Sequence, residues 1–202
     1  MRRRPQPGEE VPDTERKKKM TKVLLAESMR TLMLEKSFDK ITIRMITDEA
    51  GVIRPTFYNY FCDKYEVLEW LFTEDIINRV RELFGQGMYT EGIKMIFVYM
   101  KKDQIFYKRA FEVHGQNSFK SIVFKYINEL FLEDIGKSSI PGKTATPLLT
   151  ADFVAGYYAM TLANILQVWI QRDIQDYSVE DMVDAYEYLL THNIKDYMNS
   201  EK

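Results

Sequence analysis

The sequence predicts an all-α protein with a small N-terminal head and a larger C-terminal body. Apolar residues recur at helical spacing from residue 21 onward, and the breaks between these segments are short and polar. The alternation of apolar and polar residues that is typical of strands does not compete with this pattern. Of the 202 residues 46% are apolar, so the chain can bury the core of one large domain or two small ones.

Residues 1–20 are rich in charge and contain three Pro residues, but they carry no apolar period. This composition predicts a disordered basic arm over residues 1–20. The arm has no apolar stretch after its charges, so it is not expected to act as a secretory signal. The single cysteine, Cys62, fits a reducing compartment, and we expect a cytoplasmic protein.

The first helix of the head is predicted over residues 21–36, and residues 37–39 break it. Its inward stripe, at the spacing of an amphipathic helix, consists of Leu25, Ser28, Met29, Leu32 and Met33. A second, short helix starts at Thr42, whose hydroxyl can cap the first turn, and it ends at Gly51.

The third helix starts near Ile53 or Arg54, because Pro55 belongs in a first helical turn, where a missing N–H costs nothing. At 100° per residue, Phe57 and Phe61 share an inward face. The side chains that this register turns outward are those of Pro55, Thr56, Tyr58 and Asn59.

A long fourth helix follows, with Asp63 and Glu66 in a capping-box pattern, and it runs to Phe84. The later segments also have helical periodicity, and Ser178 with Asp181 can cap the last of them. We predict helices over Ile93–Met100, Gln104–Val113, Asn117–Ile135, Ala151–Arg172 and Val179–Met198. The apolar run from Phe153 to Ile170 contains Asn164 and Gln167, so no membrane segment is expected.

The second and third helices, joined by a glycine turn, form a helix-turn-helix whose second helix fits a major groove. The net charge of −2 argues mildly against a nucleic-acid partner. The distribution of charge along the chain, however, favours an anionic partner for the head. Residues 1–64 hold 14 Lys and Arg against 10 Asp and Glu, whereas residues 65–202 hold 14 against 20.

The segment MLEKSFDKITIRMITDEAGVIRPTFYNYFCDKYEVLEWLF resembles the TetR family of bacterial transcription regulators. The family pattern T-x-Y-x-Y/H-F, followed by a Lys that opens a long helix, is met by Thr56, Tyr58, Tyr60, Phe61 and Lys64. The resemblance covers residues 20–72. It implies a homodimer with a DNA-binding head at residues 21–66 and a helical body at residues 67–202 that binds an effector and dimerises.

The resemblance also implies a set of DNA-contacting residues: Thr42, Arg44, Arg54, Pro55, Thr56, Tyr58, Asn59, Tyr60 and Lys64. Thr42 would meet a phosphate, Arg54 suits bidentate contact with guanine, and Lys64 at a helix N-terminus suits a phosphate clamp. An alternative interpretation packs the rings of Tyr58 and Tyr60 on the fourth helix, and Thr42 can act as a cap in addition.

The sequence departs from the family at two places in the head. The family often has Ser or Thr where Ile53 stands, and Ile53 cannot cap the third helix. The family often has Gly where Ser37 stands. Ser37 must therefore either adopt the backbone conformation that a glycine would take there or avoid it. We expect local stability costs, of order 1 kcal/mol for a lost cap. In the arm, the basic residues at 2–4 and 16–19 either lie in a minor groove or are simply solvated.

The helix predicted over Ala151–Arg172 is apolar on most sides, which predicts a four-helix dimer interface with the last helix. The predicted interface residues are Phe153, Tyr157, Leu162, Leu166, Trp169, Met182, Tyr186, Leu189 and Leu190. Such a dimer would set two recognition helices about 34 Å apart. The alternative is a monomer with an unusually apolar core.

Aromatic walls with a few polar groups, as small-ligand sites have, predict an effector pocket in the middle of the body. Its predicted residues are Tyr99, Phe106, Tyr107, His114, Gln116, Asn117 and Phe119. His114 and His192 lie far apart, so neither a metal site nor a cofactor is expected. The order of motifs in the body also resembles the branch of the family that includes dihydroxyacetone-kinase-type regulators.

The leading functional prediction is a regulator, usually a repressor, that binds a palindromic operator as a homodimer and responds to a small-molecule effector. The alternative is a co-regulator that acts mainly through protein contacts and binds DNA weakly. An enzyme is not expected, because the sequence contains no G-x-S-x-G, P-loop or dinucleotide motif and no metal cluster.

Overall fold

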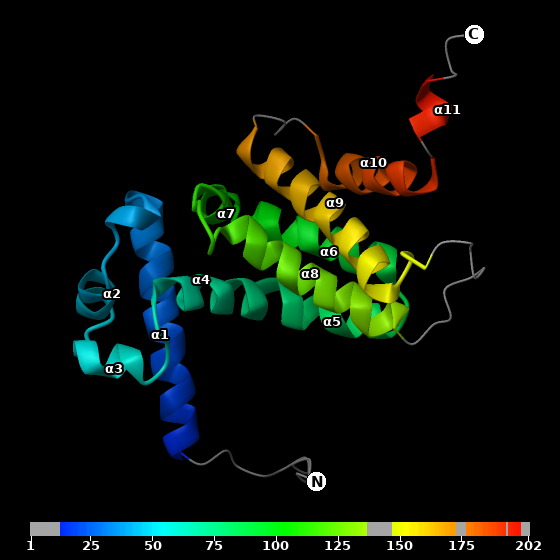
Figure 1. The fold of residues 1–202 in the computed structure, drawn as a ribbon. Coiled ribbons are helices and arrows are strands. Elements are labelled where there is room, and N and C mark those ends of the chain that lie inside the picture. Colours follow the sequence, from blue (N-terminus) through cyan, green and yellow to red (C-terminus); the bar gives the residue numbers. More distant parts are fainter. Residues whose placement is uncertain (1–12, 137–146, 173–176, 193, 199–202) are drawn as a thin grey trace, which may run out of the picture. The chain divides into compact units, whose positions relative to one another are not determined.

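The computed structural model describes residues 13–136, 147–172, 177–192 and 194–198. Every regular element within these ranges is a helix (Figure 1), which confirms the predicted all-α fold class. The chain divides into two compact units, Met1–Val67 and Leu68–Lys202, which we call the head and the body.

The head contains α1 (Asp13–Glu35), the 3₁₀ turn η1 (Phe38–Lys40), α2 (Ile43–Glu49), α3 (Arg54–Tyr58) and the start of α4 (Lys64–Phe72). The predicted disordered arm is therefore wrong for residues 13–20, which form the first two turns of α1. Residues 1–12 lie outside the described residues. The predicted inward stripe of the first helix is confirmed, because all five of its side chains are buried.

The turn between α2 and α3 depends on one glycine. Gly51 has a φ of 66°, a left-handed conformation that costs residues with a Cβ about 1–2 kcal/mol. Its N–H donates to the Asp48 carbonyl at 3.2 Å, and the N–H of Val52 donates to the Thr47 carbonyl at 3.0 Å. Ser37 avoids the left-handed region with a φ of −64°, so that departure from the family pattern causes no backbone strain.

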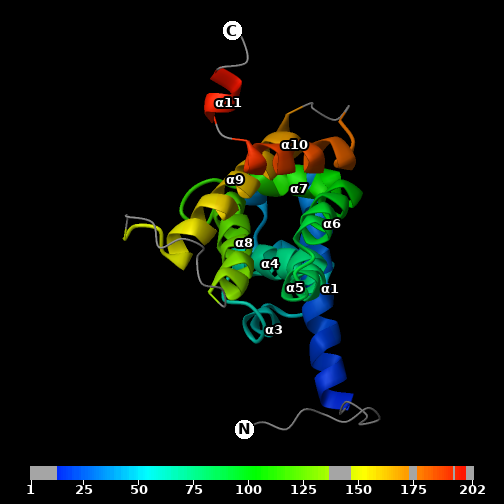
Figure 2. The same cartoon turned by 90° about the vertical axis from the view of Figure 1, so that its right-hand side faces the viewer.

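In the body, α4 continues into a π-helical turn, η2 (Thr73–Ile77), and then into α5 (Asn78–Gly85). The remaining helices are α6 (Tyr89–Lys102), α7 (Gln104–Phe111), α8 (Phe119–Ile135), α9 (Ala151–Gln171), α10 (Val179–Thr191) and α11 (Ile194–Met198). Among them, α6 and α8 pack against this long element, α9 lies on α8 and α10 lies on α6 (Figure 2). The capping box of α10, with Ser178 and Asp181, is present as predicted.

The last predicted helix, Val179–Met198, is wrong as a single element, because α10 ends at Thr191. His192 has extended backbone angles of −115° and 133°. Its ring stacks on the ring of Tyr188 with centroids 3.7 Å apart, and its Nδ1 lies 3.0 Å from the Tyr188 carbonyl oxygen. The same carbonyl also accepts the His192 backbone N–H at 3.0 Å, the last regular helical bond of α10, before the backbone turns extended.

The body core is built from aromatic side chains around the pair α8 and α9. The ring of Phe119 lies 4.9 Å from that of Phe111 and 5.4 Å from that of Phe72. By length and composition α9 is apolar enough to cross a membrane. Seven of its side chains are buried within the body, including that of Trp169, and a core helix has the same composition.

Candidate nucleic-acid interface

The helix α3 presents polar side chains on one side because two aromatic residues fix the other. Phe57 and Phe61 are fully buried, as the sequence register predicts, and their ring centroids are 5.8 Å apart. The side chains of Arg54, Pro55, Tyr58 and Asn59 are exposed, and those of Thr56 and Tyr60 are half-buried. A helix of five residues has little stability of its own, so the buried rings determine its orientation.

Arg54 and Tyr58 form a pair on the exposed face of α3. Nη2 of Arg54 donates to the Tyr58 hydroxyl at 3.1 Å, and its guanidinium carbon lies 5.8 Å from the centre of the ring. The Tyr58 ring, 48% exposed, also meets Phe57 of the same helix edge-on at 5.6 Å. These contacts of Tyr58 lie within α3, and the alternative in which Tyr58 and Tyr60 pack on the fourth helix stays open.

The start of α2 offers two further exposed side chains. The Thr42 hydroxyl accepts the Met45 N–H at 3.2 Å, which confirms its role as the helix cap. Nε of Arg44 lies 3.5 Å from Oδ2 of Asp48 on the same helix face. An exposed pair of this kind contributes at most about 1 kcal/mol, so Arg44 can exchange its partner for a phosphate at low cost.

Lys64, the predicted phosphate clamp, makes its contacts within the head. Its Nζ donates to the carbonyls of Phe38 at 2.8 Å and Ile41 at 3.0 Å, with Asp39 at 3.4 Å. The same Nζ lies 4.4 Å from the centre of the Phe38 ring, and partial burial lowers the pKa of the ammonium group. All three N–H donors are thus directed at the head itself.

The N-terminus of α4 is also occupied by the protein's own carboxylate. Oδ1 of Asp63 accepts the N–H groups of Tyr65 at 2.8 Å and Glu66 at 2.9 Å. The carboxylate of Glu66 in turn accepts the Cys62 N–H at 2.5 Å. These bonds satisfy N–H groups that a phosphate would otherwise use. In this structure Lys64 stabilises the head, and its contact with DNA stays a prediction.

Ile53 is a candidate that sequence reasoning treated only as a lost cap. Its side chain is 71% exposed and makes no capping bond, and it lies directly before Arg54 at the exposed start of α3. An apolar side chain at this place can contact the methyl group of thymine. The signal in the sequence was an apolar residue where a cap is expected.

The basic residues of the predicted arm, where described, lie on a helix. Residues 16–19 belong to α1, and all four side chains are exposed. An α-helix is about 10–12 Å across, whereas the minor groove of B-DNA is about 6 Å wide. Residues 16–19 therefore do not form an extended arm of the kind that follows a minor groove, and their contact with DNA stays a prediction. Residues 2–4 lie outside the described residues.

The sequence matches two family profiles. Residues 26–71 match the profile of bacterial regulatory proteins of the tetR family, and residues 88–192 match a transcriptional regulator C-terminal region of the same family. The chain belongs to the TetR family. DhaS, a regulator of the predicted dihydroxyacetone-kinase type, is among the proteins that the chain is similar to.

Two curated relatives and two solved structures are similar to this TetR-family chain. The dhaKLM operon transcriptional activator DhaS of Lactococcus lactis is 27% identical over 94 residues, 46% of this chain and 50% of DhaS. The uncharacterized regulator YxbF of Bacillus subtilis is 24% identical over 154 residues, 73% of this chain and 39% of YxbF. The matches thus span half or less of these relatives' own lengths.

The solved structures confirm the TetR fold. The dihydroxyacetone kinase operon activator DhaS has a TM-score of 0.57 at 24% identity, covering 85% of this chain and 94% of DhaS. A TetR regulator from Streptococcus agalactiae has a TM-score of 0.63 at 20% identity, covering 88% of this chain and 97% of that one. Members of the TetR family are transcription regulators, generally soluble and cytoplasmic.

In the body of this TetR-family protein, the predicted effector residues divide into two groups. Phe106, Tyr107 and Phe119 are buried in the aromatic core, where the Tyr107 hydroxyl donates to Oδ2 of Asp75 at 3.3 Å. His114, Gln116 and Asn117 are exposed on the connection before α8, and half-buried Tyr99 lies under the guanidinium of Arg79. The first group thus lies inside the core, whereas the second is at least partly exposed to solvent.

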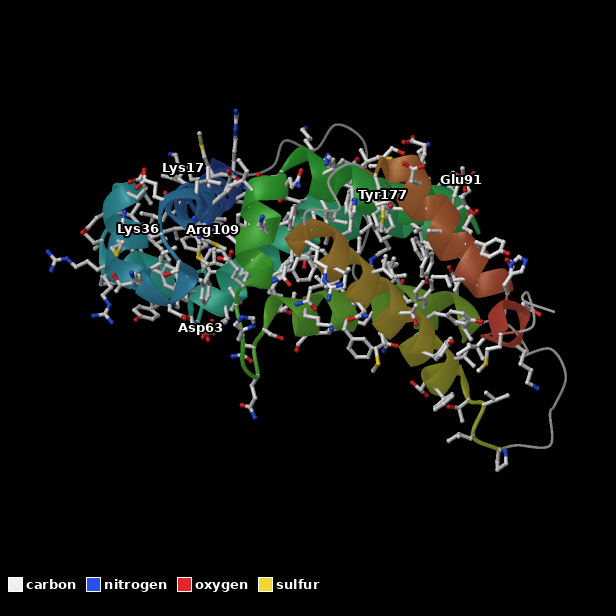
Figure 3. All side chains as sticks on the ribbon, turned by 90° about the horizontal axis from the view of Figure 1, so that it is seen from above. Lys17, Lys36, Asp63, Glu91, Arg109 and Tyr177 are labelled. Atoms are coloured by element: carbon white, nitrogen blue, oxygen red, sulfur yellow. The ribbon has the colours of Figure 1, made fainter. Side chains whose placement is uncertain are left out.

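An open groove of about 490 Å³ lies elsewhere on the body, along α7. Figure 3 labels Arg109, one of its lining residues. The groove is lined by Gln104, Ile105, Lys108, Arg109 and Glu112. It shares no residue with the predicted effector set, because that prediction followed the buried aromatic face of α7 and the groove lies on the other face.

The predicted dimer residues also divide. Leu162, Leu166, Trp169 and Tyr186 are buried within the protomer, so they have no surface to offer a partner, and we remove them from the interface. Trp169 instead packs on Phe97 at 5.2 Å. The predicted interface residues that are exposed are Phe153, Tyr157, Leu189 and Leu190, and Met182 is half-buried. Met160 and Tyr188 add to this exposed apolar surface.

Replacing Lys64 with Met should destabilise the head by about 1–2 kcal/mol, because three backbone carbonyls lose their donor. The measurement is the melting temperature by circular dichroism. Lys40→Met is the matched control, since Lys40 is an exposed neighbour in η1. Equal stability of the two variants, with operator binding lost only in Lys64→Met, would support the predicted DNA contact of Lys64.

Proposed function

We propose that this TetR-family regulator is a cytoplasmic homodimer that binds a palindromic operator through α3 and loses it when a small effector enters the body. The observation that carries the proposal is the exposed pair of Arg54 and Tyr58, held over the buried rings of Phe57 and Phe61. A guanidinium positioned in advance on a short helix suits guanine in a major groove. DNA binding, rather than catalysis, is then the activity of the chain.

Dimerisation is supported by the apolar surface that α9 and α10 leave exposed. Tyr157 is 62% exposed, Met160 61% and Leu189 50%, and large apolar side chains gathered on helices mark interaction surfaces. A second copy of the chain fits this surface because a two-fold operator requires two recognition helices about one DNA turn apart. Four helices, two from each protomer, would then form the interface.

Effector control is supported by the link between the aromatic core and the π-helical turn. Tyr107 packs against Phe119 at 5.9 Å and binds Asp75 of η2. A ligand that separates these rings would move Tyr107 and disturb this bond, and π turns recur at functional sites. We propose repression as the sign of regulation. The names of similar proteins include both an activator, DhaS, and a secondary repressor, NalD.

Selection of bound fragments from random DNA tests the function. The purified protein is expected to enrich a palindrome at both about 50 and about 200 mM salt, because base contacts add to the electrostatic attraction. Arg54→Ala should weaken binding by about 1–3 kcal/mol and relax one position of each half-site. The control Tyr89→Phe, exposed in the body, should change neither. Weak binding with no enriched palindrome would favour the protein-binding co-regulator.

Ile53 should contribute to specificity through a thymine methyl group. Replacing each thymine of the selected operator by uracil removes only that methyl, and at one position it should weaken wild-type binding about 3–10-fold, in line with the energy of a buried methyl group. In Ile53→Ser the same replacement should have no effect, because the methyl group then has no apolar partner on the protein. Equal sensitivity of the two proteins at every position contradicts this role.

Charge on the exposed faces of α9 and α10 should dissociate the dimer. Tyr157→Glu combined with Leu189→Glu is expected to shift the mass in sedimentation toward the 23.9 kDa protomer, because the interface would bury unpaired carboxylates. Ile105→Glu is the control, since Ile105 is also exposed in the body, on α7. A dimer that survives the double substitution would place the interface elsewhere.

A further inference from the structure

The first turns of α1 carry more positive charge than any other described helix start in the head. Five basic residues lie between positions 13 and 22, against Asp13 and Glu15. Two carboxylates cannot neutralise five cations, and cations near a helix N-terminus oppose the helix dipole. These charges therefore do not stabilise the helix end that they occupy.

The contact of Lys22 shows which face of α1 points toward the rest of the head. The Nζ of Lys22 lies 5.1 Å from the centre of the Phe61 ring, three residues beyond the end of α3. At 100° per residue Lys18 lies only about 40° from Lys22, one turn nearer the N-terminus, and Lys19 lies about 60° from it on the other side. Lys18 and Lys19 thus lie on the side of α1 that faces the Phe61 ring, just beyond the end of α3.

The same face is apolar further along the helix. Leu25, Ala26 and Met29 continue the line from Lys18 and Lys22, and all three are fully buried against the head. The inward face of α1 therefore turns basic toward its N-terminus, in the part of the helix that extends past α3 in Figures 1 and 2. Arg16 and Lys17 lie more than about 100° away, on the outer side.

We propose that Lys18 and Lys19 bind backbone phosphates of the duplex, beside the bases that α3 reads, and so lengthen the DNA site. The proposal rests on the proposed function, because it requires α3 to hold the operator. At about 1.5 Å per residue, Lys18 lies about 6 Å beyond Lys22 along the helix axis, and an extended lysine adds a reach of similar length. Exposed ammonium groups at this distance fit phosphates flanking a half-site, which carry no sequence information.

The salt dependence of binding tests the proposal with the full chain and the selected operator. Lys18→Gln with Lys19→Gln should lower the slope of log affinity against log salt by about 0.9 for each phosphate that is no longer neutralised, thus by about 2 per protomer. The selected base sequence should stay the same. Gln keeps the helix propensity close to that of Lys, so circular dichroism should show intact α1.

Arg16→Gln with Lys17→Gln is the matched control, since it removes the same charge from the same two turns but from the outer face. We expect it to change the slope by less than half as much. Equal changes in both double variants would reduce the effect to general charge and overturn the proposal. A wild-type slope in Lys18→Gln/Lys19→Gln, with the operator still selected, overturns this proposal alone, and a wild-type protein that selects no operator overturns the proposed function with it.

Discussion

The whole candidate interface depends on the burial of two rings, Phe57 and Phe61, beneath a helix of five residues. So short a helix cannot hold its own shape in water, because nucleation costs more than its few hydrogen bonds return. Its position is set by the two buried rings and by the Gly51 turn before it. It is also set by Lys64, which follows it and bonds to backbone carbonyls of the head. The exposed face is free to be polar because none of its side chains has to stabilise the fold.

The head shows which features a sequence can predict. Thr42 as a cap, Gly51 at positive φ and the inward pair of phenylalanines follow from rules that span four residues or fewer, and all are present. The role of Lys64 could not be predicted, because its acceptors lie 23 to 26 residues away and are backbone carbonyls. Every residue has a backbone carbonyl, so the sequence does not indicate which carbonyls accept a bond, whereas a phosphate-binding motif can be recognised in it.

The body shows a different limit. A helix that is apolar on most sides must be covered, but its sequence does not say which sides are covered by its own chain. Trp169 and Tyr157 are both aromatic residues of α9, and yet one is buried in the protomer and the other is mostly exposed. Hydrophobicity predicted that α9 would be covered, and only the packing of α6, α7 and α8 on α9 separates its core residues from its exposed ones.

The π-helical turn η2 changes the spacing of buried residues along the long helix from Lys64 to Gly85. Leu68, Phe72, Ile76, Val80 and Phe84 recur every four residues, and all five are buried. In an ordinary α-helix each step of four residues drifts by about 40°, so such a ladder would wind around to the opposite side. Bonds from i to i+5 widen the turn and reduce the rotation per residue, so the ladder stays closer to one side. A hydrophobic period of about four, instead of about 3.6, is thus the mark that this wide turn leaves in the sequence.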